Sequence, residues 1–373
     1  MTYDLRMRRL LIVVLASLAL PAAAESWKFA VAGDSRNCGD VVMPGIAAGV
    51  KADHAVFYWH LGDYRALYNF DQDMVKVAKT PYTISDYIAA AWPDFIKNQV
   101  APFTPLPVYL GIGNHELVAP KTRGDYLAQF ADWLLQPPIQ KQRIDPEDHV
   151  LRTYYHWKQG GVDFISLDNA SYDFDSGQMS WITKLLAKDE SDPEIKSIVL
   201  GMHAALPHSL GCDHSMNETA SGEWSGVVVY KQLLDFRART HKNIYVIASH
   251  SHFLIRDAYD SPYWRVHGGV IPGIIIGTAG AVRYRLPDTV AGFPPERAKT
   301  DIYGYLIGTV GDDGSIAFEF KQIDRAAVSA DVVSRYGGEF VDWCWAENKD
   351  PRPRSSEQCS KVDAPSGPVT GHQ

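Results

Sequence analysis

Hydrophobic residues fall along this chain in short apolar runs separated by longer amphipathic stretches. Several runs are continuously apolar, as strands buried on both faces are. A further apolar run follows Asp313-Gly314, which predicts a hairpin that turns at this pair. The runs rich in β-branched and aromatic residues, which we predict to be strands, are residues 27–33, 54–62, 106–113, 162–168, 195–202, 243–249, 270–280 and 303–310.

In the stretches between these runs, apolar residues recur every three or four positions. This helical spacing occurs in residues 85–100, 124–136 and 176–190, and Ser176 is expected to cap the last helix. Strands that alternate with helices predict an α/β fold in which the sheet is packed between helices. Two long polar loops, residues 206–226 and 285–300, interrupt this order, and such loops are more often functional than idle.

The first residues have a different composition from the rest of the chain. Three arginines at residues 6–9 precede an apolar stretch from Leu10 to Leu20, and small residues follow at 22–24. This pattern is typical of a signal peptide over residues 1–24, because the apolar stretch is about half of the ~20 residues that span a bilayer. We expect an exported chain, periplasmic or secreted, that begins at Glu25. An uncleaved N-terminal anchor is the alternative.

Charge and cysteine content narrow the class of protein. The 373 residues include 44 acidic and 36 basic side chains, for a net charge of −8, which argues against nucleic acid as a partner. Four cysteines in an exported chain indicate two disulfides. We expect Cys344 to pair with Cys359 and Cys38 with Cys212. Free, buried thiols are the alternative.

The length permits one large core or two smaller domains. We expect one domain over residues 25–346, because strand and helix patterns continue throughout it. Residues 347–373 are rich in Pro, Ser and charge and have little to bury, which predicts a largely disordered tail. No membrane attachment is expected after cleavage of the signal peptide, and the oligomeric state is left open.

Residue types that bind metals follow five of the predicted strands at the point where each ends. In α/β sheets, ligand sites lie beyond the carboxyl ends of strands, so we expect these side chains to meet. Oxygen and nitrogen ligands without a thiolate suit Mn, Zn or Fe. Singly, such residues are more often turn, cap or core residues, so the prediction depends on their joint pattern. They are Asp34, Asp63, Asn114, His203, His250 and His252.

These strand ends resemble the motifs of the calcineurin-like metallophosphoesterase superfamily, which includes the purple acid phosphatases. The resemblance extends from about Trp27 to Lys321 and implies two packed mixed β-sheets flanked by helices, a four-layer α/β sandwich. It is carried, in this order, by Gly33-Asp34, Gly62-Asp63, Gly113-Asn114-His115-Glu116, Gly201-Met202-His203 and His250-Ser251-His252.

The resemblance also implies a site for two divalent metal ions, with Mn, Zn or Fe as candidates. Asp63 would bridge both ions, and Asp34 and His252 would complete the shell of one. The other ion would be held by Asn114, His203 and His250. His115 would act as a general acid or transition-state stabiliser, oriented by a nearby carboxylate.

The first motif departs from the family pattern Asp-x-His, because Arg36 stands in place of the histidine. A guanidinium has no lone pair for a cation, so the ion beside Asp34 lacks a ligand unless Asn37 or water supplies one. We interpret Arg36 as a clamp for phosphate oxygens, which its planar fork matches. The alternative is a salt bridge to a nearby carboxylate such as Asp40. Ala66 stands where purple acid phosphatases have their iron-binding tyrosine, so a purple iron–phenolate centre is not expected.

The sequence therefore predicts an exported, metal-dependent phosphoesterase that hydrolyses small phosphate esters with a hydroxide activated by two metal ions. Monoesters, diesters and nucleotides all fit this prediction. The alternative is a catalytically impaired metal- or phosphate-binding protein of the same fold, motivated by Arg36. A zinc peptidase is disfavoured, because Ala119 stands where HExxH would place its second histidine. His208, Asp213 and His214, in the loop after His203, are interpreted as ordinary loop residues.

Overall fold

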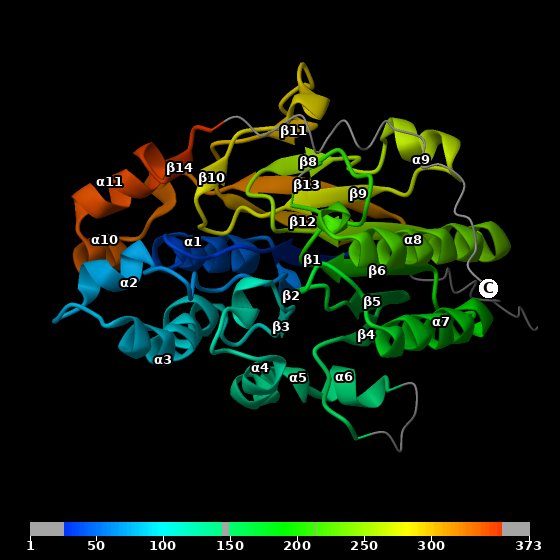
Figure 1. Ribbon diagram of the computed structural model, residues 1–373, viewed down its shortest axis with the longest axis horizontal. Coiled ribbons are helices and arrows are strands. Elements are labelled where there is room, and N and C mark those ends of the chain that lie inside the picture. The colour runs from blue at the N-terminus through cyan, green and yellow to red at the C-terminus, as the bar shows by residue number, and fades with distance from the viewer. Residues whose placement is uncertain (1–25, 144–148, 213, 353–373) are drawn as a thin grey trace, which may run out of the picture.

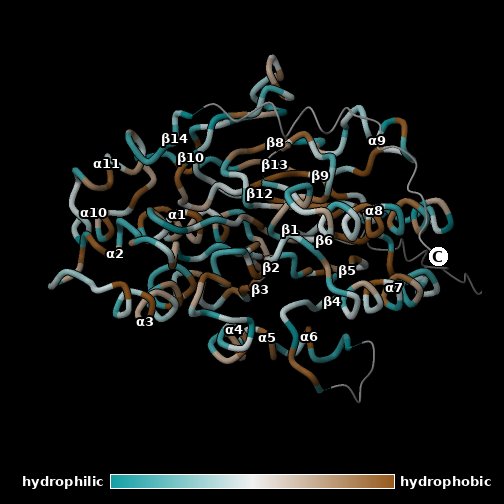
Figure 2. Tube along the Cα trace, in the orientation of Figure 1, coloured by the Kyte–Doolittle hydropathy of each residue, from teal (hydrophilic) through white to brown (hydrophobic). Residues whose placement is uncertain are grey.

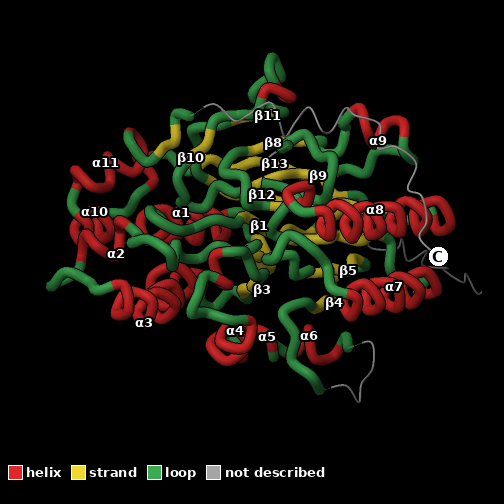
Figure 3. Tube along the Cα trace, viewed as in Figure 1, coloured by secondary structure: helices red, strands yellow, loops and turns green. Residues whose placement is uncertain are grey.

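The computed structural model describes residues 26–143, 149–212 and 214–352, and two β-sheets form its centre, with helices outside them (Figures 1 and 3). The predicted signal peptide, residues 1–24, and Cys359 lie outside the described residues. The two large sheets are both mixed, so the predicted architecture of two packed sheets flanked by helices is confirmed.

The first sheet contains five strands in the order β13-β12-β1-β2-β3. Strand β1 pairs in parallel with β2 and antiparallel with β12, which joins the N-terminal strand to the end of the domain. Strands β12 and β13 form the predicted hairpin, and Gly314 in its turn has a φ of 80°. The strands are β1 (Trp27–Ala32), β2 (Ala55–His60), β3 (Val108–Leu110), β12 (Gly304–Val310) and β13 (Ile316–Gln322).

The second sheet contains seven strands in the order β11-β8-β9-β7-β6-β5-β4. Strands β5, β6, β7 and β9 at its centre are parallel to one another, and β8, β11 and β4 are added at the two edges by antiparallel pairing. The strands are β4 (Tyr155–Gln159), β5 (Val162–Ser166), β6 (Ser197–Met202), β7 (Asn243–Ala248), β8 (Leu254–Arg256), β9 (Gly273–Ile276) and β11 (Ala298–Lys299). A separate pair joins β10 (Arg283–Tyr284) to β14 (Lys349–Asp350).

An aromatic layer fills the space between the two sheets. Phe57 of β2 contacts Phe164 of β5 edge to face, with ring centroids 5.0 Å apart, and Trp59 contacts Trp157 of β4 at 5.1 Å. Gly201 allows this packing, because a Cβ there would lie 2.0 Å from the Trp59 ring. Aromatic pairs add about 0.5–1.5 kcal/mol each to the free energy of burial. Figure 2 shows hydrophobic residues along strands of both sheets, such as β9 and β3.

Helices cover both outer faces of the sheets, with α1 against the first sheet and α7 and α8 against the second (Figure 1). Helix α7 begins after Asp175, whose side chain accepts a hydrogen bond from the Gln178 N–H, so the predicted cap at Ser176 is wrong by one residue. The α-helices are α1 (Gly39–Ala52), α2 (Gln72–Val77), α3 (Ile84–Phe95), α4 (Arg123–Gln129), α5 (Ala131–Leu134), α6 (Pro137–Lys141), α7 (Ser176–Ser191), α8 (Ala220–Thr240), α9 (Pro262–Val266), α10 (Ala330–Tyr336) and α11 (Gly338–Ala346). Shorter helical turns occupy Ile96–Val100, Ala101–Phe103, His115–Leu117, Met216–Glu218, Asp288–Val290 and Arg325–Ala327.

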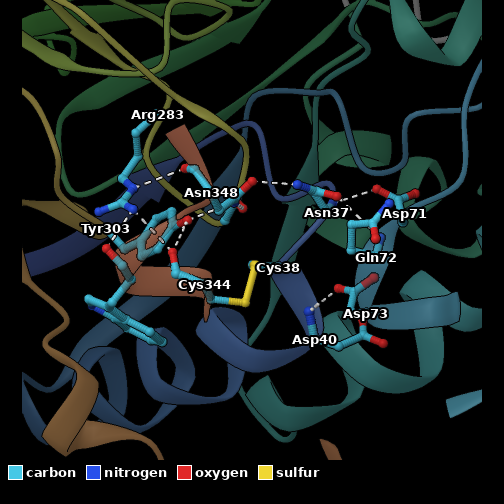
Figure 4. The surroundings of a disulfide bond; sticks show 12 residues. Asn37, Cys38, Asp40, Asp71, Gln72, Asp73, Arg283, Tyr303, Cys344 and Asn348 are labelled. Carbon is cyan, nitrogen blue, oxygen red and sulfur yellow. Dashed lines mark hydrogen bonds between the residues drawn. A yellow bond between two sulfur atoms is a disulfide. The ribbon is translucent and has the colours of Figure 1, made fainter. Parts of the chain in front are cut away.

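A disulfide joins Cys38, at the start of α1, to Cys344 in α11 (Figure 4). The predicted pairs Cys38–Cys212 and Cys344–Cys359 are therefore wrong. Spacing in the sequence favoured the nearer cysteine for Cys344, whereas the fold places α11 beside the first helix. Both cysteines of the bond are fully buried.

Ordered structure continues beyond residue 346, where the sequence predicts the tail to begin. Asn348 is buried and donates hydrogen bonds to the Gly280 carbonyl and to the Tyr303 hydroxyl, and β14 follows it. The remaining described residues of the predicted tail end at Arg352. Within the described parts of the chain, no helix has both the length and the apolar character needed to cross a bilayer.

Candidate metal centre

The predicted ligands at the five strand ends lie together at one edge of the two sheets. His203, after β6, has its Nε2 atom 3.0 Å from Asn114 Oδ1 and 3.2 Å from Asp63 Oδ1. His250, after β7, places Nδ1 2.9 Å from the same His203 Nε2 atom. These four side chains, from both sheets, converge on one point as the sequence predicts.

Asp34 and His252 lie on the other side of Asp63. Asp34 Oδ1 is 3.2 Å from His252 Nε2, and Asp34 Oδ2 accepts a hydrogen bond of 2.7 Å from the backbone N–H of His250. The last contact joins the end of β1 in the first sheet to the loop after β7 in the second. All six predicted metal ligands therefore belong to one cluster.

Backbone strain accompanies this convergence. Asp34, Asp63 and His250 have φ angles of 62°, 59° and 65°, a left-handed conformation that non-glycine residues adopt rarely and at functional sites. Gly113 provides the room that the cluster needs, because a Cβ on it would lie 2.3 Å from Asp63 Oδ1.

The chemistry of these atoms fits a divalent metal ion. Ligand atoms of Asp34, Asp63, His203 and His250 lie within 4.8 Å of one another, and all four residues are buried. Asp34 Oδ1 and Asp63 Oδ2 are buried without a hydrogen-bond partner, which is costly for carboxylate oxygens and leaves both atoms available to a metal ion. His203 Nδ1 lies 3.0 Å from the Leu61 carbonyl, so Nδ1 carries a hydrogen, and Nε2 is the ring atom that faces the cluster and can bind a metal once its own proton is displaced.

Charges within the cluster shift the pKa values of its groups in opposite directions. Although burial opposes it, Asp63 raises the pKa of His203 to about 9. Burial likewise opposes ionisation of Asp63, but His115 and His203 hold the pKa of this carboxyl well below its usual range. A carboxylate is thus available at the centre at neutral pH.

Arg36 lies inside this cluster, with only 8% of its surface exposed. Its Nε atom is 3.9 Å from Asp63 Oδ2, Nη1 is 2.5 Å from His115 Nε2, and Nη2 is 3.1 Å from His252 Nε2. The alternative partner considered for Arg36, Asp40, is bound instead by Arg65. The guanidinium therefore faces the metal ligands.

Asn37 does not fill the position left by the missing histidine. Its side-chain N–H group donates to Asn348 Oδ1, and its side-chain oxygen, Oδ1, accepts a hydrogen bond from the Gln72 backbone N–H (Figure 4). Tyr64 is buried in the core, where its ring stacks on Phe95 at 4.1 Å, so it is no metal ligand.

His115 is oriented by a backbone carbonyl, and a carboxylate, as the sequence suggests, lies nearby: Asp63 Oδ2 is 3.5 Å from His115 Nε2. Its Nδ1 atom lies 2.6 Å from the carbonyl oxygen of Ala66. Burial, reinforced by Arg36, lowers the pKa of His115 to about 4. The adjacent Glu116 accepts backbone N–H groups from Asp63, Tyr64 and Gly113, at 2.8–2.9 Å, and so ties the second motif to the third.

Several residues at the site were not predicted. The Tyr172 hydroxyl lies 3.0 Å from His250 Nε2, and the hydroxyls of Tyr68 and Tyr284 are each 3.4 Å from Arg36. Tyr68 and Tyr172 lie in loops and Tyr284 in the two-residue strand β10, and none of these positions gave a sequence signal. His214 is not an ordinary loop residue, because its ring lies 4.8 Å from that of His250.

The model of one protein family matches residues 37–254, which is more than half of the chain; it is described as calcineurin-like phosphoesterase. The chain belongs to this family. The predicted family and enzyme class, a metallophosphoesterase, are therefore confirmed. The matched range of this phosphoesterase includes Asp63, Asn114 and all three histidines that the sequence predicts as ligands, but it begins after Arg36.

Solved structures of similar fold include phosphatases. A purple acid phosphatase from yellow lupin (Lupinus luteus) seeds matches with a TM-score of 0.52 and 16% identity, over 80% of this chain and 52% of the lupin chain. PhoD matches with a TM-score of 0.50 and 14% identity, over 81% and 72%. A dimetal phosphatase from Danio rerio matches with a TM-score of 0.50 and 12% identity, over 79% and 96%.

The phosphoesterase spans about half the length of the lupin protein that it matches. At these identities the likeness concerns the fold alone. A comparison with curated proteins by sequence found no match.

Proposed function

We propose that this phosphoesterase hydrolyses small phosphate esters at the cluster of strand-end ligands, with the help of divalent metal. The observation that carries this proposal is the convergence of buried carboxylate and imidazole ligands in which Asp34 Oδ1 and Asp63 Oδ2 lack any hydrogen-bond partner. Membership of the calcineurin-like family supports the same reaction class.

Asp63, Asn114, His203 and His250 would hold an ion, with Mn, Zn and Fe as candidates. The ion would supply Lewis acidity, which polarises a phosphoryl oxygen and makes water a better nucleophile. The Leu61 carbonyl and the Tyr172 hydroxyl orient the two imidazoles from behind. The sequence predicts a second ion beside Asp34 and His252, and this ion would require Arg36 to leave His252 Nε2.

Arg36 and His115 are the two residues that we propose act on the phosphoryl group. Water attacks phosphorus, the bond from phosphorus to the ester oxygen breaks, and the alcohol departs with a proton. Arg36 has an unpartnered Nε–H with which to bind a phosphoryl oxygen. His115 accepts a hydrogen bond from Arg36 through Nε2, which favours stabilisation of the transition state through the arginine over donation of a proton.

A cavity of about 370 Å³ adjoins Arg36 and offers room for the leaving group. Aromatic side chains, among them Tyr68, Phe70 and Trp343, line it together with polar and charged residues such as Asn37 and Lys349. Such a lining accommodates organic leaving groups of several kinds, so a screen of monoesters, diesters and nucleotides is the direct way to identify the substrate.

The test is hydrolysis of a chromogenic phosphate monoester by protein that has been stripped with a chelator and reloaded with Mn, Zn or Fe. Asp63→Ala should lose bound metal and at least about 100-fold in kcat/KM, because it removes a central ligand. Asp313→Ala, in the exposed hairpin turn, is the matched control and should retain both. Full activity in the Asp63 variant would rule the proposal out.

A second candidate function, a metal- or phosphate-binding protein with impaired catalysis, is favoured by Arg36 in the position of a usual ligand. The same assay separates the two functions. Metal loading and phosphate binding without turnover of any ester, under conditions where the fold is intact, would establish the second.

We also propose that the chain is exported. The basic and apolar residues of the first 24 positions support this, as does the Cys38–Cys344 disulfide, because such bonds persist in oxidising compartments.

A further inference from the structure

The guanidinium of Arg36 occupies the interior of the metal centre and not its rim. Two of its nitrogen atoms contact imidazole nitrogens, at 2.5 Å from His115 and 3.1 Å from His252, and the third faces Asp63 Oδ2 at 3.9 Å. Imidazole nitrogens and a carboxylate oxygen are the partners that a divalent ion would have at this position.

The hydrogen positions on both histidines follow from their other contacts. Nδ1 of His252 lies 2.5 Å from the Val282 carbonyl oxygen, and Nδ1 of His115 lies 2.6 Å from that of Ala66. A carbonyl oxygen only accepts hydrogen bonds, so Nδ1 carries the hydrogen in each ring. Nε2 is then the lone-pair atom, and in each ring Arg36 donates to it.

We infer that Arg36 takes the place of one metal ion, so that this phosphoesterase binds a single divalent ion beside a permanent guanidinium. The lone pair of His252, which would complete the shell of the ion beside Asp34, is used by Arg36 Nη2. A second cation at this position would also lie next to a buried positive charge, because a guanidinium cannot lose its proton in proteins.

The remaining ligands suffice for one ion. Atoms of Asp34, Asp63, His203 and His250 lie within 4.8 Å of one another, and Asn114 Oδ1 is 3.0 Å from His203 Nε2. Asp34, which a two-ion centre would assign to the other ion, can turn its unpartnered Oδ1 to this one. His252 is then a positioning residue for Arg36 and binds no metal.

The arrangement also gives Arg36 a part in phosphate capture, and this step depends on the proposed function. The Nε–H of Arg36 is buried, has no partner, and is too far from Asp63 Oδ2 for a hydrogen bond. A phosphoryl oxygen between the guanidinium and the single ion would be neutralised from both sides, as it is between two metal ions.

Metal content tests the inference without reference to activity. Stripped full-length protein is titrated with Mn²⁺, and bound metal is measured by elemental analysis and by electron paramagnetic resonance. We expect one ion per chain at saturation, with the hyperfine pattern of an isolated ion. Two ions per chain, or the spectrum of a spin-coupled pair, would overturn the inference. So would a chain that binds no ion.

Variants of two residues sharpen this test. His252→Ala should still bind one ion, because its ring holds Arg36, whereas in a two-ion centre it would lose an ion. Arg36→His restores the family pattern and should raise the content to two ions with spin coupling. The double variant Arg36→His/His252→Ala should bind fewer ions than Arg36→His alone.

Arg239→His, an exposed arginine paired with Glu190, is the matched control and should keep the parent content of one ion. If Arg36→His also kept one ion, the arginine would not be what excludes the second, and the inference would be wrong. A parent chain with two ions that still hydrolyses esters would refute this inference alone and leave the proposed function intact.

Discussion

Replacing both Cys38 and Cys344 by alanine would release helix α11 from the start of α1. The bond closes a loop of 306 residues, and the chain-entropy relation gives about 5.7 kcal/mol for such a loop at 25 °C. Measured losses on removal of native disulfides are about 2–5 kcal/mol, so we expect the free energy of unfolding to fall by about 3–5 kcal/mol. That is a large part of the ~5–15 kcal/mol typical of folded domains.

Helix α11 should nevertheless stay in place in the folded variant. The carbonyl oxygen of Cys344, a backbone atom, accepts hydrogen bonds from the Tyr303 hydroxyl at 2.9 Å and from Arg283 Nη2 at 3.2 Å. Neither bond depends on the sulfur atoms. Metal content in the absence of denaturant should therefore equal that of the parent chain.

The assay is unfolding in guanidinium chloride without reductant, followed by tryptophan fluorescence, for the parent, both single variants and the double variant. Each single variant breaks the same bond, so each should lose nearly as much free energy as the double variant. If the two single losses were small and added up to the double loss, no bond between Cys38 and Cys344 would exist and the argument would fail. A double variant as stable as the parent would refute the expected loss of about 3–5 kcal/mol in the free energy of unfolding.

Two further predictions concern the pH dependence of stability and the residue at which the mature chain begins. Burial raises the pKa of Asp163, whose carboxyl lies 2.8 Å from His156 Nδ1, to about 7, so the folded chain retains a proton that the unfolded chain releases near pH 4. The contribution of Asp163 to the free energy of unfolding should therefore fall as pH rises from about 4 through 7. In denaturant unfolding, the stability of the parent relative to Asp163→Asn should be lower at pH 8 than at pH 5; an equal difference at both pH values would contradict the assignment. For export, Edman sequencing or intact mass of secreted material should give Glu25 as the first residue, and a chain that retains residues 1–24 would disprove cleavage there.

The residues that converge in the cluster could be predicted from sequence because each follows a local event, the end of an apolar run. His203 directly follows β6, Asp34 and Asp63 come two and three residues after β1 and β2, and the carboxyl ends of neighbouring strands meet at one edge. Helix α1 was not predicted, because Gly39–Ala52 is apolar and contains Pro44, which hides a helical period. Local pattern thus identifies the centre better than it identifies its surroundings.

The contacts of Arg36 and the disulfide depend on long-range geometry that no local pattern contains. Asp40 lies near Arg36 in sequence, but in the fold it is paired with Arg65. Arg36 therefore faces the predicted metal ligands. Cys344 has a nearer candidate partner in sequence than Cys38, and only the position of α11 beside α1 decides between them (Figure 1).

The position of β1 in the first sheet determines when its two edges can be paired during synthesis of the chain. β1 ends two residues before Asp34 and lies between β2, which follows it closely in sequence, and β12, which ends at Val310. During synthesis one side of the first strand stays unpaired until most of the chain has been translated. Pairings of such high contact order form slowly, and unpaired strand edges aggregate readily. A chain truncated at residue 254, where the family match ends, would leave that edge permanently open.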